Sequence, residues 1–190
     1  MIRFAPALLL ALAALPGCGS SAQPDLESSD PYERYLGALE AAEGEPKEFL
    51  PKLERLLKDP DPLARTGAVV ALVQSRRPEA ARLVALALAD PDLGVRAEAA
   101  RAAGEFKDPT LLPALLGILS TDAHAEPRRV AALALEAYGN LPEVRAGLVE
   151  ALADPAAGVA FNAHRSLCRI TGRADLPRRR EAAEEALKGS

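Results

Sequence analysis

Two kinds of segment alternate along most of the chain with a period of 31 to 33 residues. The first kind opens with a proline, which a first helical turn tolerates, and then carries leucines at helical spacing. Its members begin at Pro46, Pro78, Pro109, Pro142 and Pro177. The second kind follows a turn that is led by Asp59, Asp90, Asp122 or Asp154. Nine residues after each aspartate stands an alanine, at Ala68, Ala99, Ala131 and Ala163, so a small face recurs in every copy.

A period of this length is typical of a solenoid, in which one helix pair cannot bury its apolar faces alone and stacks on its neighbours. We therefore expect an all-α solenoid of about four helix pairs with a capping helix at each end. The expected repeats cover residues 46–77, 78–107, 108–140 and 141–173. Asp30 as N-cap and Pro31 in the first turn predict the N-terminal capping helix, over residues 30–44. The polar segment 177–188 is the expected C-terminal cap.

The first residues of the chain have the features of an export signal. Arg3 precedes an apolar run over residues 4–15 that is too short to span a bilayer as a helix. The sequence Leu15-Pro16-Gly17-Cys18 resembles the lipobox of bacterial lipoproteins. The resemblance implies cleavage after Gly17, a lipid on Cys18, and an anchored protein at the cell envelope. The alternative is an ordinary signal peptide cut near residues 20–22, which would give a soluble periplasmic or secreted protein. Residues 18–29 are polar and without period, so we interpret them as a flexible tether.

The Asp-led segments follow the pattern Asp-Pro-Asp-x-x-Val-Arg-x-x-Ala-x-x-Ala-Leu/Ala-Gly. Over residues 45–188 this pattern, alternating with leucine-rich helices, resembles the HEAT-like repeats of phycobilin lyases. In that family the leading Asp and the Arg six residues later form a ladder along the stack. The matching pairs are Asp59 with Arg65, Asp90 with Arg96, and Asp122 with Arg128. Ala160 stands at the Arg position after Asp154, so we expect the ladder to end before the fourth repeat.

Composition narrows the class of partner. The chain has a net charge of -4 and only 4% aromatic residues. Without a basic field it has no surface for the phosphates of a nucleic acid, and we expect no nucleic-acid partner. If Cys18 carries a lipid, Cys168 is the other cysteine and lacks a partner within the chain, which excludes a disulfide framework.

Three groups of residues are candidates for chemistry. His164, Ser166 and Cys168 lie close together on a predicted helix, where imidazole can activate a thiol, although packing explains them as well. Asp122, His124 and Glu126 alternate in the turn of the third repeat and offer ligands for a divalent metal, although loop acids are commonly just solvated. The run Arg178 to Arg180 lies where a helix dipole disfavours cations, which would suit an anion or a lipid headgroup, or simply a solvated cap. We expect no catalytic site, metal or cofactor.

These observations predict a non-catalytic, lipid-anchored scaffold or protein-binding module at the bacterial cell envelope. Its membrane contact is the lipid on Cys18, and its partner is a protein that the sequence does not identify. The second helices of the pairs should line a concave face, as is common in solenoids. Expected contacts on that face are Arg101, Arg129, Tyr138, Asn162, Arg165 and Arg169. The alternatives are an enzyme or enzyme accessory that resembles the bilin lyases, and a structural envelope protein whose partner is a second copy of itself.

Overall fold

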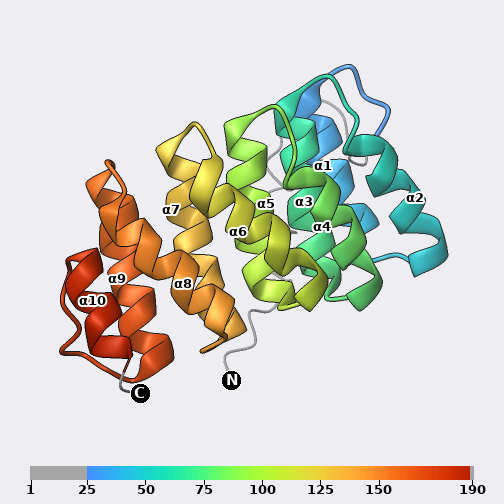
Figure 1. Cartoon of the computed structure of the whole chain (residues 1–190). Coiled ribbons are helices and arrows are strands. Elements are labelled where there is room, and N and C mark those ends of the chain that lie inside the picture. Colours follow the sequence, from blue (N-terminus) through green and yellow to red (C-terminus); the bar gives the residue numbers. More distant parts are fainter. Residues whose placement is uncertain (1–24, 189–190) are drawn as a thin grey trace, which may run out of the picture.

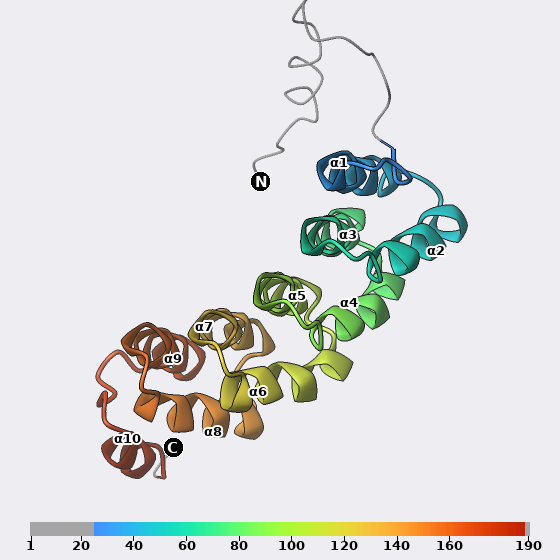
Figure 2. The same cartoon turned by 90° about the horizontal axis from the view of Figure 1, so that it is seen from above.

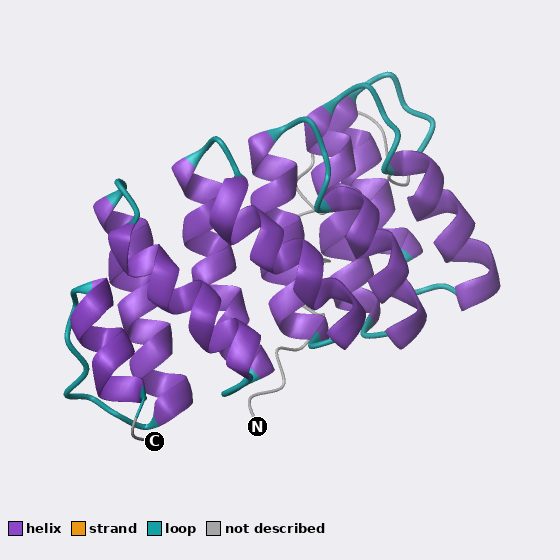
Figure 3. Ribbon diagram, viewed as in Figure 1, coloured by secondary structure: helices purple, strands orange, loops and turns teal. Residues whose placement is uncertain are grey.

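The computed structural model describes residues 25–188. Within these residues the chain forms helices and no strand (Figure 1, Figure 3). Four helix pairs follow one another: α2 (Pro46–Leu56) with α3 (Pro62–Ser75), α4 (Ala81–Ala87) with α5 (Leu93–Phe106), α6 (Leu112–Thr121) with α7 (Ala125–Ala134), and α8 (Pro142–Glu150) with α9 (Ala157–Thr171). Single helices stand at the two ends, α1 (Pro31–Ala41) and α10 (Arg180–Leu187). Four 3-10 turns extend individual helices: η2 (Pro78–Ala80), η3 (Pro109–Leu111), η4 (Leu135–Tyr138) and η5 (Ala151–Ala153).

The helices form two curved layers, which Figure 2 shows end-on. Helices α1, α3, α5, α7 and α9 make the concave layer, and α2, α4, α6, α8 and α10 make the convex layer. This arrangement confirms the expected all-α solenoid with a terminal helix at each end. No helix among residues 25–188 combines the length and the apolar character that crossing a bilayer requires.

Local sequence explains where the concave helices begin and end. The carboxylates of Asp30, Asp61 and Asp92 each accept a hydrogen bond from the backbone N–H two residues later, which caps the first turns of α1, α3 and α5. At the other end, Arg76 and Lys107 adopt left-handed conformations with φ of 52° and 54° and so terminate α3 and α5.

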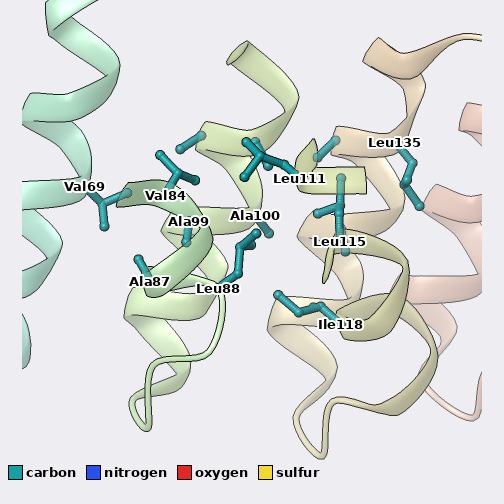
Figure 4. Packing of buried hydrophobic residues seen from close by; sticks show 14 of the residues in the cluster. Val69, Val84, Ala87, Leu88, Ala99, Ala100, Leu111, Leu115, Ile118 and Leu135 are labelled. Atoms are coloured by element: carbon teal, nitrogen blue, oxygen red, sulfur yellow. The ribbon is translucent and has the colours of Figure 1, made fainter. Parts of the chain in front are cut away.

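The core runs continuously between the two layers. Leucine and valine from the convex layer meet small residues from the concave layer, as Figure 4 shows for Val84, Leu115, Ala99 and Ala100. The concave helices approach one another closely because glycine or alanine stands at their contacts. A Cβ at Gly104 of α5, for example, would lie 2.9 Å from the Cβ of Ala134 in α7. These small contacts bring the concave helices together and are consistent with the curvature of the stack.

Both ends of the stack differ from the sequence-based expectation. Residues 25–29, predicted to be part of the tether, instead pack on α1, since a Cβ at Gly37 would lie 2.9 Å from the backbone nitrogen of Leu26. Pro177 does not begin a helix, and α10 begins at Arg180 instead. Residues 172–179 fold across α9 and bury Leu176. The predicted signal peptide, the predicted lipidation site Cys18 and the rest of the predicted tether lie outside the described residues.

Candidate functional site

A ladder of arginines and aspartates joins each repeat to the next along one edge of the stack. Arg65 donates from Nε and Nη2 to the carboxylate oxygens of Asp90, both at 2.8 Å, and from Nη1 to the carbonyl oxygen of Asp59, also at 2.8 Å. Arg96 repeats this geometry with the Asp122 carboxylate, at 2.6 and 2.9 Å, and with the Asp90 carbonyl at 2.8 Å. Each arginine therefore binds the backbone of its own repeat and the side chain of the following repeat.

The pairing corrects two expectations. The carboxylate partner of each ladder arginine is the aspartate of the next repeat, whereas the aspartate six residues before it contributes only its carbonyl oxygen. The ladder also reaches the fourth repeat, because Arg128 donates to the Asp154 carboxylate at 2.7 and 3.0 Å. Ala160 stands at the position from which an arginine would bind the aspartate of a following repeat. The ladder therefore ends after Asp154 rather than before it.

The ladder also begins one step earlier than the sequence pattern indicated. Arg34 of α1 donates to the Asp59 carboxylate at 2.8 and 2.9 Å and to the carbonyl oxygen of Ser28 at 2.7 Å. Arg34 stands six residues after Ser28, as Arg65 stands six after Asp59, so α1 is the second helix of a partial repeat with serine at the leading position. This six-residue spacing would have identified Arg34 as a ladder residue from the sequence.

The ladder carboxylates are buried and fully engaged. The side chains of Asp90, Asp122 and Asp154 are 6%, 4% and 8% exposed. Hydrogen bonds from Arg96 outweigh burial and lower the pKa of Asp122 below its ordinary value. Burial raises the pKa of Asp154, but the hydrogen bonds from Arg128 and from the Ala156 backbone together bring it below the ordinary value. With both oxygens bonded, these aspartates hold neighbouring repeats in register and have no free position for a ligand.

The two acidic residues of the candidate metal cluster are engaged in ion pairs. Of the predicted metal ligands, Asp122 binds Arg96, and Glu126 binds Arg129 at 2.6 and 2.7 Å. Among residues 25–188 there is no group of three or more side chains placed to hold a metal. His124 is exposed, with Nδ1 3.4 Å from the guanidinium of Arg96.

The cysteine and histidine of α9 lie in loose contact. The Cys168 sulfur is 3.7 Å from Nε2 and 3.9 Å from Nδ1 of His164. Both distances are long for a hydrogen bond that would activate the thiol. His164 Nε2 donates to the carbonyl oxygen of Leu176 at 2.9 Å, and Ser166 is fully buried. The cluster therefore packs α9 against the segment that covers it.

The concave face remains as an open surface. We define it by the residues four, seven, eleven and fifteen positions after the leading residue of each repeat, which form the outward stripe of each concave helix opposite the buried alanines. In α1 and α3 the first three of these positions are uncharged: Tyr32, Tyr35, Leu39, Leu63, Thr66 and Val70. The rings of Tyr32 and Tyr35 stack at 6.3 Å. In α5, α7 and α9 the stripe gains charge, with Arg101, Glu105, Glu126, Arg129, Arg165 and Arg169.

Four of the six expected contact residues reach this face, and two do not. Arg101, Arg129, Arg165 and Arg169 belong to the concave stripe. Asn162, by contrast, is only 7% exposed. Tyr138 is half-buried, and its hydroxyl lies 3.0 Å from the carbonyl oxygen of Ala103 and 3.2 Å from that of Asp108, so it joins the end of α7 to α5. Burial accordingly raises the pKa of Tyr138 to about 12.

The sequence reasoning also missed the large apolar side chains of the concave face. Tyr32 and Phe161 are each 54% exposed and Leu63 is 41% exposed. Their positions in the repeat, four or seven residues after the leading residue, were the available signal. Arg180, from the arginine run near the C-terminus, pairs with Glu150 at 2.8 Å and therefore ties α10 to α8. Lys188 pairs with Glu185 at 2.9 Å within the same segment.

Comparison with known proteins agrees with this architecture. A family model described as HEAT repeats matches residues 80–168, which span the second, third and part of the fourth repeat. The part of the chain from residue 80 to residue 168 therefore resembles HEAT repeats in sequence. Its fold is similar to the crystal structure of an engineered protein, with a TM-score of 0.52, 23% identity and 76% of each chain covered. No curated protein matches the sequence.

Proposed function

We propose that this HEAT-like protein is a non-catalytic scaffold that binds a protein partner on its concave face and is held at a cell envelope by a lipid on Cys18. The observation that carries the binding half is the exposure of Tyr32, Leu63 and Phe161 on that face. Exposed aromatic and aliphatic side chains on an extended curved surface favour an interaction site over a merely solvated one. HEAT repeats commonly mediate contacts between proteins, which supports the same conclusion.

The binding half is tested with a photo-crosslinking residue introduced into the full-length protein in its own cells. Ala97 lies in the middle of the concave stripe, and Arg82 is an exposed position on α4 in the convex layer. We expect a discrete crosslinked protein from the Ala97 position and none from the Arg82 position. The same product from both positions, or none from Ala97, would contradict a binding role for the concave face.

The anchoring half is supported by the sequence Leu15-Pro16-Gly17-Cys18, which resembles a lipobox. Metabolic labelling with a fatty acid should tag the wild-type protein and a Cys168→Ala control, whereas Cys18→Ala should lose both the label and the membrane association. A Cys18→Ala protein that stays in the membrane fraction would refute lipid anchoring. An unlabelled protein cut near residues 20–22 would show the soluble alternative.

A further inference from the structure

Phe161 and Arg165 form a distinct patch at the C-terminal end of the concave face. They lie four residues apart on α9, so they share one face of the helix, and both are exposed. We infer that this patch recognises a short acidic segment of a protein partner, with a carboxylate on Arg165 and a neighbouring apolar side chain on Phe161. The inference rests on the proposed function and specifies the chemistry of the partner.

The chain contains a matched comparison for Arg165. Arg101 occupies the same position of the repeat on α5, but its guanidinium binds Glu98 at 3.1 Å and also pairs with Glu105. On α9 the corresponding neighbours of Arg165 are Asn162 and Arg169, and Arg165 forms no ion pair with any residue of the described chain. Arg101 is therefore neutralised within its own helix, whereas Arg165 keeps its charge and its hydrogen-bond donors for an external carboxylate.

The surroundings of Phe161 leave its ring open. Position four of the repeat, one turn before Phe161, is Gly158, and no side chain extends from it over the ring. Arg129 of α7 lies beside Gly158, with its Cδ 3.6 Å from the place of a Cβ there, and Glu126 neutralises it. Aromatic residues and arginine are enriched at protein interfaces, and arginine is frequent among the residues that contribute most to binding.

The rest of the concave face selects against other anions. Arg101 pairs with Glu98 and Glu105, Arg129 pairs with Glu126, and Arg169 pairs with Glu136, so a polyanion such as a nucleic acid would find little unpaired positive charge along its length. An extended anionic membrane surface would also fail to enter a concave surface. A segment with one or two carboxylates next to an apolar side chain needs only the unpaired Arg165 and the exposed Phe161.

A random peptide library displayed against the full-length protein in detergent provides the probe. We expect enrichment of peptides that combine aspartate or glutamate with an aromatic or aliphatic residue. Fluorescence anisotropy measures the affinity for the selected peptide. Arg165→Glu and Phe161→Ala should each lower this affinity by about tenfold or more, whereas Arg101→Glu should change it by about twofold or less. Changing the peptide carboxylate to lysine should restore binding to Arg165→Glu. All three side chains are exposed, and unchanged circular dichroism and Tm would verify folding.

Each outcome decides the inference. Enriched peptides without acidic residues, an absence of enriched peptides, or an equal loss from Arg101→Glu and Arg165→Glu would overturn it. If the crosslink from Ala97 persists while Arg165→Glu has no effect on the peptide or the crosslink, the proposed function stands and the inference about α9 fails. If Ala97 gives no crosslink, the proposed function fails, whatever the peptides show.

Discussion

Removal of one ladder arginine tests whether the rungs hold the repeats together. Arg96 binds Asp122 of the next repeat through two charge-assisted hydrogen bonds, and the two side chains are 14% and 4% exposed. Breaking a fully buried ion pair by removing one partner costs about 3–5 kcal/mol, because the remaining charge stays desolvated. Since the Arg96 side chain is partly hydrated, we expect Arg96→Ala to lower the free energy of unfolding by about 2–4 kcal/mol.

Arg101→Ala is the matched control on the same helix. The Arg101 side chain is 44% exposed and pairs only within α5, so its loss should cost about 0.5 kcal/mol or less. Thermal and urea denaturation followed by circular dichroism measure both variants. For a chain of this size, each kcal/mol corresponds to about 2–4 °C in Tm, so Arg96→Ala should melt roughly 5–15 °C below the wild type.

The pH dependence gives a second measure of the same rung. Hydrogen bonds from Arg96 lower the pKa of Asp122 in the folded state. A carboxyl of this kind stabilises the fold above its unfolded pKa of about 4, and the stabilisation disappears as pH falls through the folded pKa. The difference between wild type and Arg96→Ala should therefore shrink between about pH 5 and pH 2. A loss no larger than that of Arg101→Ala, or a loss independent of pH, would refute the role of the ladder.

Four further substitutions probe other positions, each by thermal denaturation. Gly104→Ala should destabilise the protein by about 1–3 kcal/mol, because its Cβ would lie 2.9 Å from that of Ala134, whereas Gly117→Ala, with open space around it, should stabilise by about 0.5–1 kcal/mol. Lys107→Gly should stabilise by about 1 kcal/mol, since it relieves a side chain from a φ of 54°, and a lower Tm would contradict this. Tyr138→Phe should cost about 1 kcal/mol through loss of its hydroxyl hydrogen bonds, and an unchanged Tm would argue against them.

The solenoid was predictable because its signals are local. A capping residue such as Asp92 marks where a helix starts, and the alanine nine residues after each leading Asp marks its buried face. Both signals lie within one repeat. The ladder pairing was not predictable from charge alone. Arg65 has an aspartate six residues before it and another 25 residues after it, and only the packing of α3 against α5 decides which carboxylate it binds.

The composition of the concave face was predicted in part. Asn162 was expected to be exposed on the basis of helical phase. Consecutive residues of a helix are rotated by about 100°, however, and this rotation turns Asn162 away from the exposed Phe161 and toward the buried side. Tyr138 was also expected on the surface, but it lies in the 3-10 turn η4 that follows α7. The tighter 3-10 turn η4 starts at Leu135 and shifts the phase, so the Tyr138 ring turns toward α5.

The ladder gives each interior repeat a direction. Asp90 receives a guanidinium from the preceding unit, and Arg96 of the same unit delivers one to the following unit. A tandem duplication of residues 90–121 would therefore supply matching partners at both new junctions, whatever the number of copies. A unit added after α9 would meet Ala160 instead. The architecture thus allows the protein to lengthen by gene duplication in its middle while its last repeat closes the series.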